Sequence, residues 1–438
     1  MTGAERAKVL RAIAAGIRAR LPELARLEVI DNGIGIPEAQ QERIFEGTWL
    51  YIGHASEVPK HGDYRARRMG RQPVLMIRNA QGSVEVLMNR CRHRGAMVCE
   101  GESGNTKHLR CWFHGWIYDA SGNLTQVPGQ GAYGPEFDQK AMGLTKPARV
   151  EIYRGFVFAS LNPRVPSLDE HLGPAKAMID LMVDASPVGE IRVDAGVHKT
   201  VYNGNWKLVG MDGYHVHYVH ASVIAAWNRD PDSGLAATHR GDPFDDESAS
   251  RTRDLGHGHV MLDLTHHRMS HYGSFTSMLE KLPGGTDYMR AMKAKHGEER
   301  AKLLISLAGD PHVGIYPNLQ LINNQIRILN PISADECEVI MFPVLFEGVS
   351  PEINALRLRQ HESFYGPAGS GSPDDAEIFE RAQKGMKAEA NPWLELSRGL
   401  HREEVGADGV ITGCISDEVT QRGQMRQWRQ LMTANVAQ

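Results

Sequence analysis

The chain has 438 residues, more than one average domain needs, which predicts two domains or one large domain with an insertion. Its 49 Lys and Arg balance its 53 Asp and Glu, and the two kinds are well mixed, so no basic surface for nucleic acid is indicated. No apolar run approaches the roughly 18 residues that span a membrane, and the amphipathic N-terminal segment carries arginines where a secretion signal is apolar. We therefore expect a cytoplasmic protein without a nucleic-acid or membrane partner.

Three regions are predicted along the chain. Residues 1–45 are helical in period, with a turn at Asp31-Asn32-Gly33, and are expected to pack on the catalytic part of the protein. In residues 46–162 the period changes to two, which predicts a small antiparallel β-sandwich. Its strands are expected at 63–69, 73–79, 84–89, 108–111, 116–119 and 155–161.

Residues 163–438 are predicted to form the α+β body of the protein. The pattern indicates, in order, a helix at 168–184, strands at 190–202, a His-rich helical segment at 205–227, strands at 314–349 and helices to the C-terminus.

The stretch "DNGIGIPEAQQERIFE" at 31–46 resembles the ATP-binding segment of sensor histidine kinases. That fold needs an Asn-bearing helix before this segment and a Gly-rich lid after it. No asparagine precedes Asn32, and the β-rich region follows instead. The stretch is better explained as a turn and a short helix beginning near Pro37, with Ile44 and Phe45 facing inward.

Cysteine and histidine indicate metal binding. The five cysteines are odd in number and scattered, which is a poor disulfide framework, whereas 20 histidines are unusually many. Cys91-x-His93 and, seventeen residues later, Cys111-x-x-His114 each supply one thiolate and one imidazole. Zinc modules usually keep like ligands together, so the alternating order favours a Rieske [2Fe–2S] centre over a zinc site. Cys99, Cys337 and Cys414 are interpreted as small buried hydrophobic residues.

A second cluster lies in "GNWKLVGMDGYHVHYVHASV". On a helix, Asp212 and His215 share one face, and so do His217 and His220. His215 and His220 are five residues apart and share a face only where the helix is distorted or ends. Spacing alone therefore favours His217 and His220 as a pair of metal ligands.

Together, the two motifs resemble the large (α) subunit of Rieske non-haem iron ring-hydroxylating oxygenases, and the similarity extends over nearly the whole chain. The resemblance implies an α+β protein with a Rieske antiparallel β-sandwich and a catalytic domain of the helix-grip (START or Bet v1-like) fold. It also implies that His215 and His220, rather than His217, bind a mononuclear Fe(II). The third ligand is expected in "FYGPAGSGSPDDAEIF", where Asp375 matches and Asp374 is the alternative.

The family works as a trimer, in which Asp212 matches a carboxylate that links His114 on the cluster of one subunit to His215 on the iron of the next. A metal-bound imidazole needs an acceptor for its outer N–H, so this role is physically reasonable. Tyr365 and residues 315–323 are candidates for the substrate pocket. The segment between Trp206-Lys207 and Asp212 is about three residues shorter than is usual in the family, so pocket residues from that stretch cannot be transferred.

The resemblance implies the terminal oxygenase of a multicomponent system. Electrons from NAD(P)H would pass through a separate reductase, with or without a ferredoxin, because no flavin or nicotinamide fingerprint is present in the chain. The product would be a cis-diol or hydroxylated form of an aromatic or related small substrate, or alternatively an N- or O-dealkylated one. A small β subunit is compatible with the length. A Rieske electron carrier without catalysis is disfavoured by the cluster at 212–220.

Overall fold

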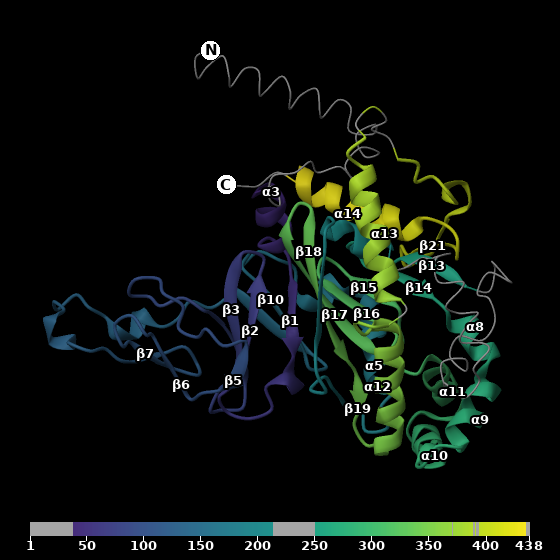
Figure 1. Cartoon of the computed structure of the whole chain (residues 1–438), viewed down its shortest axis with the longest axis horizontal. Coiled ribbons are helices and arrows are strands. Elements are labelled where there is room, and N and C mark those ends of the chain that lie inside the picture. Colours follow the sequence, from purple (N-terminus) through teal and green to yellow (C-terminus); the bar gives the residue numbers. More distant parts are fainter. Residues whose placement is uncertain (1–37, 213–249, 370, 389, 391–393, 435–438) are drawn as a thin grey trace.

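The computed structural model describes residues 38–212, 250–369, 371–388, 390 and 394–434. An arm built from β-strands projects from a larger body, in which helices pack around a long sheet (Figure 1). The predicted N-terminal helix and the turn at 31–33 lie outside the described residues. The first described elements are α3 (Glu38–Gln40) and the π-helix η1 (Gln41–Phe45).

The inward positions of Ile44 and Phe45 are confirmed. Both side chains are buried, and the Phe45 ring packs edge-on against Trp206 with 5.1 Å between ring centroids. Since Trp206 belongs to the body, this short helix attaches the start of the β-rich arm to the body.

The arm consists of three antiparallel sheets, with strand orders β1-β10-β9, β4-β3-β2-β5 and β6-β7-β8. All six predicted strands are present, and β1, β5, β8 and β9 are additional. The strands are β1 (Leu50–His54), β2 (Asp63–Met69), β3 (Gln72–Arg78), β4 (Val84–Met88), β5 (Ser103–Asn105), β6 (His108–Arg110), β7 (Ile117–Asp119), β8 (Leu124–Gln126), β9 (Arg149–Tyr153) and β10 (Phe156–Ser160).

The body is built on one antiparallel sheet of nine strands, in the order β12-β18-β17-β16-β15-β14-β13-β21-β20. A separate pair, β11 (Ile191–Arg192) and β19 (Leu345–Phe346), lies beside it. The nine strands are β12 (His198–Tyr202), β13 (Arg251–Asp254), β14 (Val260–Asp263), β15 (Val313–Ile315), β16 (Leu319–Ile322), β17 (Gln325–Ser333), β18 (Glu336–Pro343), β20 (Glu404–Val405) and β21 (Ile411–Cys414).

The prediction of helices alone after residue 349 is wrong, because the hairpin β20–β21 extends the sheet. Its strands are too short to show a period of two, and only the Asp408-Gly409 turn between them signals a hairpin. Gly409 has a φ of 80°, a conformation that favours glycine at this turn.

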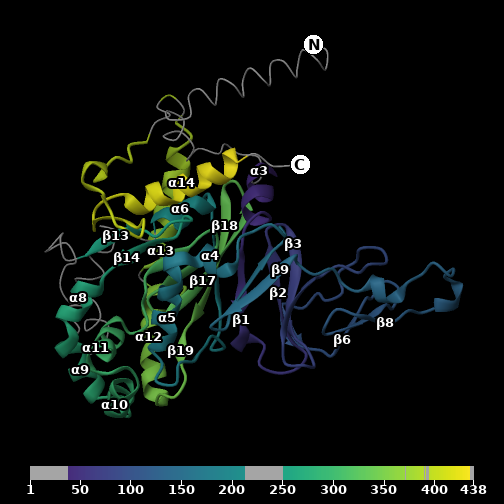
Figure 2. The same ribbon diagram turned by 180° about the vertical axis from the view of Figure 1, so that it is seen from behind.

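Helices cover both faces of the nine-stranded sheet. On one face lie α6 (Trp206–Asp212), α12 (Pro351–Tyr365), α13 (Ser372–Gly385) and α14 (Val419–Thr433), and on the other lie α4 (Leu168–Leu172) and α5 (Lys176–Asp184) (Figures 1 and 2). The sheet packs against both groups of helices because successive side chains along each strand point to opposite faces. In β18, Val339 and Met341 pack toward the first group, and Ile340 and Phe342 pack in the second core.

Two details of the helices differ from the sequence prediction. The helix expected at 168–184 is divided by a 3-10 turn at Gly173–Ala175, which contains Pro174. A separate helical group, not predicted, packs at the side of the body around its own core. It consists of α8 (Thr265–Ser270), α9 (Tyr272–Glu280), α10 (Gly285–His296) and α11 (Glu298–Leu307). Among the described residues, no helix combines the length and apolar character that crossing a bilayer requires.

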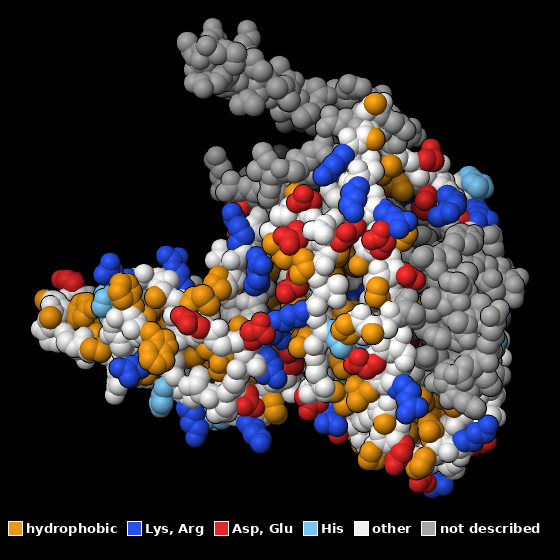
Figure 3. Space-filling view, in the orientation of Figure 1, with side chains coloured by type: hydrophobic (Ala, Val, Ile, Leu, Met, Phe, Trp, Pro, Cys, Tyr) orange, Lys and Arg blue, Asp and Glu red, His pale blue; other side chains and the backbone are white. Residues whose placement is uncertain are grey.

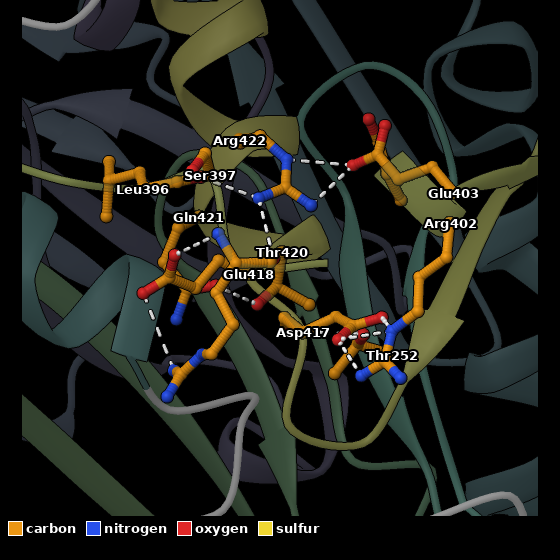
Figure 4. A network of polar contacts seen from close by, with 12 residues as sticks. Thr252, Leu396, Ser397, Arg402, Glu403, Asp417, Glu418, Thr420, Gln421 and Arg422 are labelled. Carbon is orange, nitrogen blue, oxygen red and sulfur yellow. Dashed lines mark hydrogen bonds and ion pairs between the residues drawn. The ribbon is translucent and has the colours of Figure 1, made fainter. Parts of the chain in front are cut away.

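Ion pairs and hydrogen bonds connect the parts of the C-terminal segment 394–434 with one another (Figure 4). The fully buried Asp417 accepts hydrogen bonds from the Arg402 guanidinium and, at 2.8 Å, from the Cys414 backbone N–H. Arg422 pairs with Glu403 at 2.7 Å. Helix α14 itself packs against α6.

Candidate functional site

Two loops at the end of the arm have nearly the same backbone geometry. In the first, the Gly95 N–H donates to the Cys91 carbonyl at 3.0 Å, and in the second the Gly115 N–H donates to the Cys111 carbonyl at 2.9 Å. Both glycines have a positive φ, 77° and 73°, so each turn closes where a side chain would be strained. The matched turns bring four predicted ligands together from two loops, of which the second joins the hairpin β6–β7.

The four predicted ligands lie close together, the two thiols next to each other and the two imidazole rings next to each other. The Cys91 and Cys111 thiols are buried side by side. Burial raises the pKa of the Cys91 thiol, and the adjacent Cys111 thiol raises it further. The His93 and His114 rings lie edge to face, with 4.6 Å between centroids. Thiolates on one side and imidazoles on the other fit the ligand set of a [2Fe–2S] cluster with two histidines on one iron.

Neighbouring side chains hold these ligands in place. The Tyr118 hydroxyl lies 3.2 Å from Cys91 Sγ and also accepts a hydrogen bond from the Arg92 N–H at 3.1 Å. Because the hydroxyl accepts from Arg92, its own proton is free to be donated to sulfur. The indole of Trp116 stacks on the His93 ring at 5.0 Å, with only 8° between the planes.

Exposed aromatic side chains lie next to His114. Trp112 is 82 % exposed, and the exposed Phe113 ring lies 3.9 Å from the His114 ring, centroid to centroid. Figure 3 shows hydrophobic side chains on the surface of the arm. Large exposed apolar groups next to a functional side chain are typical of a contact surface.

The second group of predicted ligands is described only in part. Asp212 is the last residue of α6, while His215, His217 and His220 lie outside the described residues, as does the side chain of Asp212. Helix α6 is well anchored, because the Gln320 amide on β16 donates to the Val209 carbonyl at 2.8 Å.

Asp375 lies in the first turn of α13, and its Oδ1 atom is shielded from solvent. Its carboxylate is close to Tyr365, the last residue of α12. Burial raises the pKa of Tyr365, and the charges of Asp310 and Asp375 raise it further. The shielded Oδ1 atom and the charge effect on Tyr365 support Asp375 as an inward-facing carboxylate.

A cavity of about 30 Å³ lies beside Tyr365. Three parts of the chain contribute its charged walls: Arg268 from α8, Asp310 after α11, and Arg357 from α12. The Asn323 amide donates a short hydrogen bond to the Tyr365 hydroxyl at its edge. Tyr365 therefore lies between the half-buried Asp375 and a cavity with charged walls.

Comparison with known proteins agrees with this geometry. Residues 48–150 match the family described as "Rieske [2Fe-2S] domain", and residues 184–434 match "Ring hydroxylating alpha subunit (catalytic domain)". The chain belongs to the ring-hydroxylating oxygenase α-subunit family. It is 35% identical to the anthranilate 1,2-dioxygenase large subunit of Acinetobacter baylyi over 90% of this chain and 86% of the relative. It is 36% identical to the 2-halobenzoate 1,2-dioxygenase large subunit of Burkholderia cepacia, over 84% and 78% of the two chains.

The fold is also shared with solved ring-hydroxylating oxygenases. A naphthalene 1,2-dioxygenase structure superimposes with a TM-score of 0.76, covering 91% of this chain and 90% of the other at 24% identity. The α+β class, with a Rieske sandwich and a helix-grip catalytic domain, is therefore confirmed. Membership of the ring-hydroxylating oxygenase family also confirms the predicted cofactors, a Rieske [2Fe–2S] cluster and a mononuclear iron.

The prediction that the three other cysteines are buried is correct for one of them. Cys337 is fully buried, as expected. Cys99 and Cys414 are only half-buried, so the interpretation as fully buried hydrophobic residues is wrong for them. The Cys99 backbone is held by Asn89, which accepts from the Cys99 N–H at 3.0 Å and donates to the Cys99 carbonyl at 2.6 Å.

A further group of possible metal ligands lies where α12 crosses β12. Ligand atoms of His198, His361 and Glu362 all lie within 4.8 Å of one another, and His198 Nε2 lies 2.8 Å from the Glu362 carboxylate. Burial, and after it the charges of His198 and Arg327, lower the pKa of His361 to about 3. Since the Arg327 guanidinium would also repel a bound cation, we assign no metal to this group.

Several residues of this ring-hydroxylating oxygenase site were missed by sequence reasoning. Tyr118 was noticed only as part of a strand. The cavity residues come from segments far apart in sequence. One signal was available for Arg357, because it occupies the buried stripe of α12 together with Ile353, His361 and Tyr365, at intervals of four residues. A charged residue in such a stripe indicates a buried role.

Proposed function

We propose that this α subunit catalyses the addition of both atoms of O2 to the ring of a substituted benzoate. The observation that carries the proposal is the union, in one chain, of the arm with the Cys and His loops and a body in which Asp375, whose Oδ1 atom is shielded from solvent, lies near Tyr365 at the edge of a cavity with charged walls. The names of the two relatives, anthranilate and 2-halobenzoate 1,2-dioxygenase, each refer to a benzene ring that carries a carboxylate. Substrate class is often shared at such similarity, and the cavity has room for a polar group.

The ligands are assigned as follows. Cys91 and Cys111 would hold one iron of the cluster, and His93 and His114 the other. His215, His220 and Asp375 would hold the mononuclear iron as two imidazoles and one carboxylate, a set that leaves coordination positions open. When bound, the two groups supply stored electrons and a site for activating O2.

The remaining residues position and connect these groups. Asp212 would accept hydrogen bonds from the outer N–H groups of His114 and His215, fixing both rings. Tyr118 donates to Cys91 Sγ, and Tyr365 forms a wall against which the ring of the substrate packs. The proposed boundaries place the N-terminal helices at 1–45, the Rieske domain at 46–162 and the catalytic domain at 163–438.

Partners are needed to supply electrons. Benzoate, O2, two electrons and two protons balance to a ring cis-diol that contains both oxygen atoms. The electrons would come from NAD(P)H through a separate reductase, with or without a ferredoxin. We propose a trimer of α subunits, alone or with three small β subunits, in which the arm of one subunit meets the body of the next.

The test is turnover of benzoate and anthranilate under 18O2 with a surrogate reductase. Two labelled oxygens in the benzoate product are expected. One labelled oxygen would instead indicate monooxygenation, the alternative that includes N- or O-dealkylation. Absence of any labelled product with both acids, while the Rieske signal is reduced by the reductase, would contradict the proposal.

A further inference from the structure

The cavity beside Tyr365 contains two arginines but only one carboxylate among its described walls. The first arginine is fully neutralised. Arg268 Nη2 lies 2.7 Å from Asp310 Oδ2 and 3.1 Å from Asn323 Oδ1, and both partners of the ion pair are buried. Burial by itself would raise the pKa of Asp310, but the Arg268 charge and hydrogen bonds from His312 and Asn323 hold it at about 2.

The second arginine has no carboxylate partner. Arg357 is 5 % exposed, and its guanidinium lies over the Phe346 ring at 3.7 Å. Nε donates to the Val344 carbonyl at 2.9 Å and Nη1 to the Ala308 carbonyl at 2.7 Å. Nη2 is buried and has no hydrogen-bond partner within the part of the chain that the structure describes.

The charge of Arg357 persists at neutral pH. Burial lowers the pKa of its guanidinium to about 10, which still leaves it protonated. Asp310 interacts with it electrostatically but is already paired with Arg268. The cavity therefore has an excess of one positive charge and one unsatisfied donor. Both are costly in a buried site unless an anion is present.

The size of the cavity limits what the anion can be. A volume of about 30 Å³ holds two or three small atoms but no aromatic ring. A carboxylate group fits this space, and a ring attached to it would extend toward Tyr365. Asp375 lies on that side, since its charge acts on the Tyr365 hydroxyl.

We propose that Arg357 anchors the carboxylate of the aromatic substrate, with Nη2 donating to a carboxylate oxygen in the cavity beside Tyr365. This inference rests on the proposed function and adds the residue that selects acids over neutral rings. The Phe346 ring and the two carbonyls hold the guanidinium in one orientation, so little freedom is lost when the acid binds. Arg268 lines the same cavity, where Asp310 holds it in place and neutralises its charge.

The test compares benzoate with benzamide, which has nearly the same shape but no charge. In the holoenzyme with a surrogate reductase, kcat/KM is expected to be higher for the acid. Arg357→Gln is expected to lower the ratio of kcat/KM for acid to amide by about 10- to 100-fold, because a hydrogen bond to a charged group is lost. Arg359→Gln, on the exposed side of the same helix, is expected to leave the ratio unchanged.

An arginine with only a structural role gives a different result. Arg357→Gln would then lower kcat/KM for both substrates equally, and an unchanged ratio overturns the proposal. Calorimetric titration of the wild-type holoenzyme tests the proposal without any variant. Equal affinity for benzoate and benzamide would also overturn the proposal that Arg357 binds the carboxylate. The two kinds of failure give different results. If the proposed function is wrong, neither substrate gives labelled product. If only the role of Arg357 is wrong, both benzoate and benzamide are hydroxylated and their ratio of kcat/KM does not depend on Arg357.

Discussion

Adjacent acidic side chains in this protein can differ in their surroundings. The clearest case is the pair Asp374 and Asp375, adjacent acids in the first turn of α13 that sequence alone did not separate. In the structure the Oδ1 atom of Asp375 is shielded from solvent, and the charge of Asp375 raises the pKa of Tyr365 after burial does so. A carboxylate pointing inward can bind a metal, while its neighbour at the helix N-terminus interacts with the helix dipole.

Asp375→Ala is therefore expected to remove the mononuclear iron and abolish turnover, while the Rieske electron paramagnetic resonance signal remains. Asp374→Ala, the matched control one residue away, should retain both iron and most of the activity. Metal analysis of the two purified variants measures this. If Asp374→Ala loses the iron and Asp375→Ala keeps it, the assignment of the ligand must be reversed.

Tyr118 acts on the cluster through one hydrogen bond to Cys91 Sγ. Such a bond stabilises the reduced, more negative cluster, so removing it lowers the reduction potential. With a net bond energy of about 1 kcal/mol, Tyr118→Phe should lower the midpoint potential by about 40 mV in a redox titration. Tyr133→Phe is the control, because Tyr133 packs near Trp116 at the arm surface. Equal potentials for the two variants would argue against the bond.

At the scale of elements, α6 connects the sheet to the segment that carries the predicted ligands. Asn205 precedes the helix, accepts a hydrogen bond from the Lys207 N–H at 3.0 Å and donates one to the Ala334 carbonyl at 2.6 Å. It is almost fully buried. This one side chain both caps the helix and attaches it to the turn between β17 and β18.

Asn205→Ala is expected to destabilise the body by about 2–4 kcal/mol, since it removes a cap and leaves a buried carbonyl unsatisfied. Ser167→Ala, which removes the cap of α4 near the surface, should cost only about 1 kcal/mol. Urea unfolding of the two variants, followed by tryptophan fluorescence, gives the comparison. Similar losses in both would show that the contact to Ala334 contributes little.

What could be read from sequence also depends on the element. The predicted strands of the arm were found because each has a clear period and a turn on either side, and the Cys and His motifs are local in sequence. The hairpin β20–β21 is too short to show a period. The cavity could not be predicted, because Arg268, Asp310 and Arg357 come from segments more than 40 residues apart that only the packed helices bring together.

At the scale of the whole molecule, the predicted cluster ligands lie on the arm, whereas Asp375, the predicted ligand of the mononuclear iron, lies on the body. The strand β6 lies in the outer part of the arm, away from α13, in both views (Figures 1 and 2). In the proposed trimer, the exposed Trp112 and His114 would contact the body of another subunit. Each active unit would then combine the cluster of one chain with the iron of its neighbour.

This arrangement predicts complementation between inactive variants. Cys91→Ser, which loses the cluster, and Asp375→Ala, which loses the mononuclear iron, should each be inactive alone. Co-expressed mixed trimers should recover a measurable fraction of turnover, because some interfaces pair an intact cluster with an intact iron site. Mixing the two variants after purification, without subunit exchange, is the control. No activity in verified mixed trimers would show that electrons stay within one chain.

The exposed indole of Trp112 has a consequence for dilute enzyme. A separated chain would leave this ring and the cluster-bearing His114 in contact with water and dissolved oxidants. Assembly would therefore protect the cluster chemically as well as complete the reaction centre. Specific activity should fall steeply once the enzyme is diluted below the concentration at which its subunits associate, and the brown colour should fade with it.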